Sequence, residues 1–178
     1  MLFRSRDPRV TSVASVFVSR WDKAIETAPK HLRNRLGIAI AQRTYRAYRE
    51  LLASPRWRGL SEAGAMPQRL LWASTGTKDP EAPDTLYVDA LAAPDTIDTL
   101  PEKTLHALAD HGKETGVMAA DGGDAEKTIA EFAAAGIDVK AIAEQLQREG
   151  AAAFVKSWNG LMQRIAEKGG TMRRAESA

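Results

Sequence analysis

Short apolar runs that end abruptly in polar residues recur three times along this chain. They lie in Thr11–Asp22, in Leu70–Ala73 and in Thr96–Leu100. Runs this short and apolar, closed by chain-breaking residues, are typical of strands buried in a parallel sheet. Helical sequence separates them, so the pattern predicts strand–helix units and an α/β fold.

Helical periodicity fills the segments between these runs. The longest helix is predicted over His31–Ser54, where apolar residues recur at spacings of three and four on one face. Thr99 and Glu102 predict a capping box at the start of a helix beginning at Pro101. The other predicted helices cover 21–27, 84–91, 101–110, 125–135, 138–150 and 151–168.

The loop after the second apolar run contains small hydroxyl side chains, a glycine and a lysine. It reads Ser74-Thr-Gly-Thr-Lys78. Glycine allows backbone N–H groups to approach a ligand closely, and hydroxyls and a cation can donate to a phosphate. Taken alone, the segment fits an ordinary solvated loop better than a phosphate site.

Several motifs in order resemble the C-terminal half of a transaldolase. They are SVASVFVSRWD, RLLWASTGTKDP, DTLYVDALAAPDTIDTLPEKT and the SWN that contains Trp158. The closest resemblance is to the bacterial branch that includes transaldolases fused to phosphoglucose isomerase. It runs from about Ser12 to Lys168. We therefore expect an unmatched segment over 1–10, a transaldolase-like part over 11–168 and a disordered tail over 169–178.

The resemblance implies part of a (β/α)8 TIM barrel. Such barrels typically need about 250 residues, whereas this chain has 178 and three convincing strands. The three strands would be the sixth, seventh and eighth of the barrel, without the first five. A partial barrel leaves a sheet edge exposed, which predicts self-association or pairing with a chain that carries the missing strands.

The resemblance also implies an activity. Transaldolases transfer a dihydroxyacetone unit between sugar phosphates of the pentose phosphate pathway through a lysine Schiff base, without a cofactor. No lysine here lies inside an apolar strand, where desolvation could lower its pKa for imine formation, since Lys78 and Lys103 lie just beyond strand ends. We expect no catalytic residue in this chain and no activity from it alone. The alternative is a non-catalytic phosphate-binding or docking fragment from a truncated gene.

The resemblance assigns phosphate binding to Arg20 and Ser74, and a place in the substrate pocket to Ser15. Many members of the family have an arginine or lysine two residues after the phosphate-binding serine, where this chain has Gly76. We therefore expect Lys78 to supply the second cation. Spacing alone leaves Arg20 as a plausible surface residue, because Ser15 and Arg20 face the same cleft only if the strand ends near Val18.

Composition narrows the remaining possibilities. The chain has no cysteine, so it forms no disulfide or thiolate metal site, and His106 and His111 lack the spacing of a metal pair. The basic N-terminus has no apolar region typical of a secretory signal, and no run is long enough for a membrane span, so we expect a cytoplasmic protein.

Residues 20–69 have eleven basic and four acidic side chains. The solvated face of an amphipathic helix explains this block more simply than nucleic-acid binding.

Overall fold

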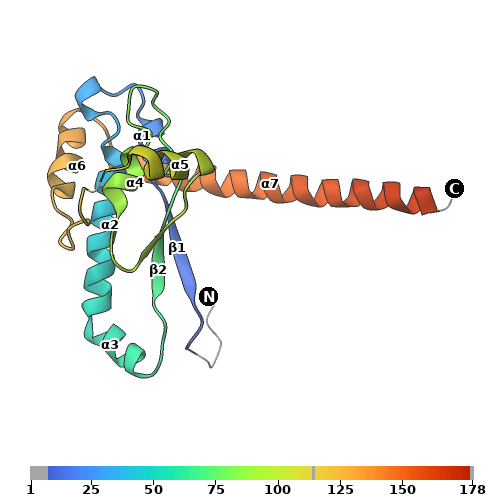
Figure 1. Ribbon diagram of the computed structural model, residues 1–178, viewed down its shortest axis with the longest axis horizontal. Helices are drawn as coiled ribbons and strands as arrows, with labels where there is room; N and C mark the ends of the chain where they lie inside the picture. The colour runs from blue at the N-terminus through green and yellow to red at the C-terminus, as the bar shows by residue number, and fades with distance from the viewer. Residues whose placement is uncertain (1–7, 114, 177–178) are drawn as a thin grey trace. The chain divides into compact units, whose positions relative to one another are not determined.

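The computed structural model describes residues 8–113 and 115–176 (Figure 1). It forms two compact units, residues 1–137 and residues 138–178. Most of the predicted unmatched N-terminal segment lies outside the described residues. The elements of the first unit are β1 (Ser12–Phe17), α1 (Val18–Ala24), the 3-10 helix η1 (Lys30–Leu32), α2 (Leu36–Ala53), α3 (Pro55–Glu62), β2 (Gln68–Ala73), α4 (Leu86–Leu91), β3 (Thr96–Asp98), α5 (Glu102–His111) and α6 (Ala125–Ala134).

The three strands form one parallel sheet in the order β1-β2-β3. Ser15 pairs with Leu71, and Leu71 pairs with Ile97, so the strands are aligned along their lengths. α1, η1, α2 and α3 intervene between β1 and β2, and α4 intervenes between β2 and β3. The prediction of an α/β fold with three parallel strands is confirmed.

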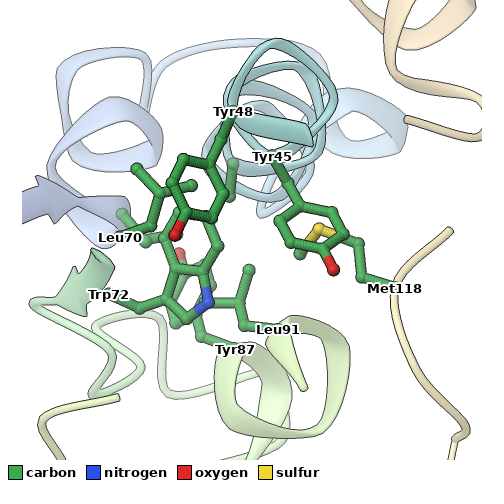
Figure 2. Close-up of a cluster of buried hydrophobic side chains, with 9 residues drawn as sticks. Tyr45, Tyr48, Leu70, Trp72, Tyr87, Leu91 and Met118 are labelled. Atoms are coloured by element: carbon green, nitrogen blue, oxygen red, sulfur yellow. The ribbon is translucent and has the colours of Figure 1, made fainter. Parts of the chain in front are cut away.

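One face of the sheet packs against α2 and α4 to make the core of the first unit. Leu70 and Trp72 point from β2 toward Tyr45 and Tyr48 of α2, as Figure 2 shows. Tyr87 of α4 completes this aromatic centre. Burying large aromatic side chains contributes most of the stabilising apolar area in a core of this size.

Among the described residues of the first unit, no helix covers the other face of the sheet. Side chains alternate between faces along a strand, so the odd-numbered residues of β1 lie on this second face. Val13 is 42% exposed and Ser15 is also exposed, whereas Ala14 and Val16 pack against the core on the first face. Parallel sheets are normally covered on both faces, whereas helices of the first unit cover this sheet on only one.

The basic residues of α2 are paired with acidic residues of the same chain. Arg43 and Arg46 both contact Glu126 of α6, at 2.5 and 2.9 Å. Arg35 contacts Glu131 at 2.6 Å, and Arg49 contacts Asp95 at 2.7 Å. Part of the basic block of residues 20–69 is therefore neutralised by acidic side chains of the same chain.

Two predicted helix starts are wrong. α1 begins at Val18, directly after β1, and not at Trp21, because the fully buried Val18 turns the chain into the core. α2 begins at Leu36 and not at His31, because Asn34 has a left-handed backbone with φ of 60° that separates η1 from α2.

The predicted capping box at α5 is also wrong. Pro101 occupies the N-cap position without a side-chain hydrogen bond. The Thr99 hydroxyl instead donates to the Trp72 carbonyl at 3.0 Å, so it links the end of β3 to β2.

The second unit is one helix, α7 (Val139–Glu176), where two helices and a disordered tail were predicted. Asp138 caps it, because its Oδ1 accepts from the backbone N–H groups of Lys140 and Ala141. Helical backbone continues through Gly150 and beyond Gly169. The helix carries an exposed apolar stripe made of Phe154, Val155, Trp158, Leu161, Met162 and Ile165.

Within the described residues, no helix has both the length and the apolar character needed to cross a membrane.

Candidate phosphate site at the ends of the strands

The loops that follow β1 and β2 meet at the carboxyl edge of the sheet. The strands pair in register up to Phe17 and Ala73. Just beyond this pair, the Ser19 N–H donates to the Ser74 carbonyl at 3.1 Å. Because this bond extends the strand pairing into the loops, Arg20 and Ser74 lie at the same end of the sheet.

Arg20 lies in the first turn of α1 and turns back over the end of β1. Its Cζ is 4.2 Å from the centroid of the Phe17 ring, which is a cation–π contact. Phe17 is on the same face of the sheet as Val13 and Ser15. The contact holds a half-buried guanidinium at the strand end, where its planar donors suit an oxyanion.

Ser74 has a left-handed backbone, with φ of 58°. This conformation costs a non-glycine residue roughly 1–2 kcal/mol. It turns the chain sharply at the end of β2, and the next residue, Thr75, is fully buried. The Thr75 hydroxyl donates to the Thr99 carbonyl at 2.9 Å, so the turn is fastened to the end of β3.

Two of the hydroxyls considered as phosphate donors bind the protein's own backbone. Thr75 donates to Thr99, and the Thr77 hydroxyl donates to the Pro83 carbonyl at 2.8 Å. They shape the loop and are not available as donors in this conformation. Among the hydroxyls of this loop, Ser74 therefore stays the candidate.

Lys78 folds back toward the space beside Gly76. A Cβ built on Gly76 would lie 3.9 Å from Lys78 Nζ and only 3.1 Å from the Pro101 ring. A longer side chain at position 76 would therefore press on the start of α5. Because Gly76 has no side chain, the amine of Lys78 can lie close to the backbone at this position.

A cavity of about 450 Å³ lies next to these loops. Its walls include Ser19, the cations Lys23, Arg33 and Lys78, and the acids Asp22, Glu26 and Asp79, with Asn34, Pro80 and Tyr87 completing them. Arg20 and Ser74 are not among the residues that line it. The structure thus brings Arg20 and Ser74 to one edge and places Lys78 in a neighbouring cavity.

Asp22 is one of the residues that line this cavity, and it fixes the start of α2. Its carboxylate accepts hydrogen bonds from the backbone N–H groups of Leu36 and Gly37, at 2.9 and 3.1 Å, and from the Tyr87 hydroxyl at 2.9 Å. Burial raises the pKa of Asp22, and these hydrogen bonds lower it in part. An acidic residue at a helix N-terminus is stabilised by the orphan N–H groups there. Sequence reasoning missed this role, since 14 residues separate Asp22 from Leu36.

Asp98 is a second carboxyl that sequence reasoning missed, half-buried with its Oδ1 atom shielded from solvent. It is the last residue of β3, and burial raises its pKa to about 6, opposed by hydrogen bonds involving Thr75 and Thr99. Within the described part of the chain, its Oδ1 has no hydrogen-bond partner. The side chain is adjacent to Trp72 in the strand register, on the core face of the sheet.

Ser15 lies midway along β1 on the uncovered face, opposite Leu71. It is therefore on the same face as Phe17, over which Arg20 lies.

The three strands contain no lysine. Of the described residues, no group of three histidine, aspartate or glutamate side chains is arranged to hold a metal ion.

Known proteins with similar sequences settle the family. The family model for transaldolase/fructose-6-phosphate aldolase matches residues 6–165. The chain belongs to this family. The transaldolase of Thermobifida fusca (strain YX) is 44% identical over 168 residues, which is 89% of this chain and 46% of the relative. The transaldolase of Parafrankia sp. (strain EAN1pec) is 45% identical over 171 residues, covering 91% of this chain and 46% of the relative. The transaldolase of Mycolicibacterium smegmatis (strain ATCC 700084 / mc(2)155) is 44% identical over 163 residues.

This transaldolase-family chain spans about half the length of the curated relatives it matches. The resemblance inferred from its motifs is therefore confirmed, including the expectation that only part of the family's sequence is present in these residues. The matched region begins slightly earlier than expected, at residue 6.

Proposed function

We propose that this chain supplies the phosphate-binding side of a transaldolase. Arg20 and Ser74 would hold the terminal phosphate of a sugar phosphate at the carboxyl edge of β1 and β2, with Lys78 as a further cation and Ser15 facing the sugar. The complete reaction would transfer a dihydroxyacetone unit between sugar phosphates of the pentose phosphate pathway, in the cytoplasm.

The observation that carries the proposal is the hydrogen bond between the Ser19 N–H and the Ser74 carbonyl. It supports a shared site because it keeps the two loops together at one end of adjacent parallel strands. Phosphate sites in barrels of this class recur in loops at this edge. Arg20 offers bidentate donors there. Its contact with Phe17 already restricts the side chain, so less conformational entropy is lost when a ligand binds.

The lysine that would form the Schiff base is proposed to lie in the half of the family's sequence that these residues do not span. The strands described here contain none. The alternative is a phosphate-binding or docking fragment that takes no part in catalysis. The two differ in one outcome: a transaldolase half gains activity when the remaining half is supplied, and a docking fragment does not.

Titration calorimetry with fructose 6-phosphate tests the phosphate site, with unphosphorylated fructose as the matched ligand. We expect the phosphate ester to bind and fructose to bind far more weakly. Arg20→Ala should weaken binding by about 1.5–3 kcal/mol, the range for a hydrogen bond to a charged group. Arg58→Ala, on the exposed side of α3, is the control and should leave binding unchanged. Equal binding of both ligands, or no effect of Arg20→Ala, would refute the site.

A further inference from the structure

We propose that α7 binds the surface of an anionic lipid bilayer through its apolar stripe, lying along the membrane interface. The stripe is the set of exposed apolar residues described above, between Phe154 and Ile165. The inference concerns the second unit alone, so it does not depend on the phosphate site or on the proposed function.

The stripe occupies one face of a stretch of α7 that is exposed all round. Each residue from Ala151 to Lys168 is exposed. Side chains at spacings of three and four share a helix face, and this holds for Val155, Trp158, Met162 and Ile165. Their exposed fractions lie between 48% and 62%. Contiguous apolar surface of this kind marks a site of interaction with a protein or a membrane.

The opposite face of this stretch is polar. Lys156, Gln163 and Glu167 follow one another at spacings of seven and four, so they share that face. Gln163 Nε2 donates to Glu167 Oε1 at 2.8 Å, which engages this carboxylate within the helix. Large apolar side chains on one face and polar side chains on the other are typical of helices that lie in a membrane interface.

The charge around the stripe favours an anionic surface. Residues 150–166 contain two basic side chains and no acidic one. Arg164 and Lys168 follow Leu161 by three and seven residues, so both lie beside the stripe. The stems of such long side chains pack along apolar surface while their charged ends reach the headgroups. Anionic headgroups attract these charges.

The helix suits the surface of a bilayer and not its interior. Among the described residues, no helix is long and apolar enough to cross a membrane. Trp158 lies near the middle of the stripe, and tryptophan favours the membrane interface. A lipid surface presents negative charge everywhere along the stripe, whereas a protein partner would need acids placed individually against Arg164 and Lys168.

Cosedimentation of the complete chain with lipid vesicles tests the proposal. One set of vesicles is pure phosphatidylcholine, and the other contains equal parts of phosphatidylcholine and phosphatidylglycerol. Trp158→Ser removes the aromatic centre of the stripe, and Arg164→Gln with Lys168→Gln removes the flanking charges. Arg56→Gln with Arg58→Gln is the matched control, because these two arginines are exposed on α3 in the first unit.

We expect the chain to bind the anionic vesicles, and to bind the neutral vesicles at least about tenfold more weakly, because each basic side chain at an anionic surface contributes about fivefold. Removal of both flanking charges should weaken binding to the anionic vesicles about 25-fold. Trp158→Ser should weaken it by at least about tenfold, since a large apolar side chain is no longer buried in the bilayer. The α3 pair should leave binding unchanged.

Fluorescence reports whether the stripe itself enters the interface. Trp158 is the only tryptophan of α7 among the four in the chain. The emission of the wild type should shift to shorter wavelength on the anionic vesicles. Trp158→Phe should still sediment with them, because the stripe stays apolar, but should show no such shift.

Four results would overturn the proposal. One is equal binding to the two kinds of vesicle, or binding to neither. Another is an equal loss of binding from the α3 pair and the α7 pair, since the attraction would then come from the net charge of the chain. The third is unchanged binding of Trp158→Ser, with circular dichroism confirming that the variant folds. The fourth is a dimer, seen by sedimentation equilibrium, that Trp158→Ser abolishes while vesicles bind no chain, because a second copy would then cover the stripe.

Discussion

The Tyr87 hydroxyl donates a 2.9 Å hydrogen bond to Asp22 Oδ2, across 65 residues of sequence. The same carboxylate accepts from the first N–H groups of α2, so one buried side chain connects α1, α2 and α4. Asp22 and Tyr87 both line the cavity beside the candidate phosphate site, so part of the cavity wall depends on this junction.

Removal of Asp22 should destabilise the fold more than removal of its tyrosine partner. Asp22→Ala leaves two backbone N–H groups and a hydroxyl without their acceptor, and Tyr87→Phe removes one donor. We expect a loss of about 0.5–1.5 kcal/mol for Tyr87→Phe and a larger loss for Asp22→Ala. Urea denaturation measures both. Tyr48→Phe is the control, because the Tyr48 hydroxyl is buried without a partner in the described structure, and it should cost nothing.

Gly37 is the second position where the junction tolerates little change. A Cβ there would lie 2.5 Å from the Val18 carbonyl oxygen and 2.7 Å from Asp22 Oδ2. Because the first of these is backbone, α1 and α2 must separate, and Gly37→Ala should cost about 1–3 kcal/mol.

Gly59→Ala provides the matched comparison in urea denaturation. Gly59 also lies in a helix, but a Cβ there meets nothing within 4 Å. Alanine should therefore stabilise α3 by about 0.5–1 kcal/mol. Equal effects of the two substitutions would contradict the close packing of α1 on α2.

Asp98 should make stability depend on pH. Its pKa is about 6 in the folded chain, against about 3.9 in an unfolded one. Between these values the folded state binds more protons than the unfolded state, so stability falls as pH rises from about 4 to 6.

The variant Asp98→Asn removes this titration. It should be more stable than the wild type at pH 7, by up to about 3 kcal/mol, and the difference should vanish near pH 3. Chemical denaturation at several pH values measures the difference, and other titrating groups cancel because they are common to both proteins. A gain that persists unchanged at low pH would contradict the assignment to Asp98.

The strands could be predicted from the sequence because each is specified by a pattern of a few consecutive residues. Leu70–Ala73 is a short apolar run with a breaker behind it, and that pattern alone identifies a buried strand. The turn at Asn34 could not be predicted, because it depends on a left-handed backbone that few sequence signals specify. The role of Thr99 could not be predicted either. Its hydroxyl donates to the Trp72 carbonyl, 27 residues away in sequence, and does not cap the helix that follows it.

In the candidate site, too, some features could be predicted from the sequence and others depend on the fold. That Arg20 and Ser74 share one end of the sheet follows from parallel strand ends, which the sequence predicts. The use of Thr75 and Thr77 hydroxyls for backbone contacts depends on loop geometry, as does the position of Lys78 beside Gly76. The buried carboxyl of Asp22 and the half-buried carboxyl of Asp98 give no sequence signal, because acidic residues are usually exposed.

The chain alone should form no imine with a ketose phosphate. An amine must be neutral to attack a carbonyl, which requires desolvation or a neighbouring cation to lower its pKa, and the described strands hold no lysine. Borohydride treatment with fructose 6-phosphate, followed by mass spectrometry, should find no adduct. A covalent adduct on Lys78 or Lys103 would contradict this expectation and would make the chain catalytic by itself.

The left-handed backbone at Ser74 sets a conflict between folding and ligand binding at one residue. Glycine would adopt φ of 58° without the roughly 1–2 kcal/mol that serine spends there. Ser74→Gly would therefore ease the turn after β2 while removing the hydroxyl that we propose binds phosphate. Stability alone would favour the glycine, so under the proposed function the serine at position 74 exchanges some stability of the fold for a hydrogen bond to the ligand.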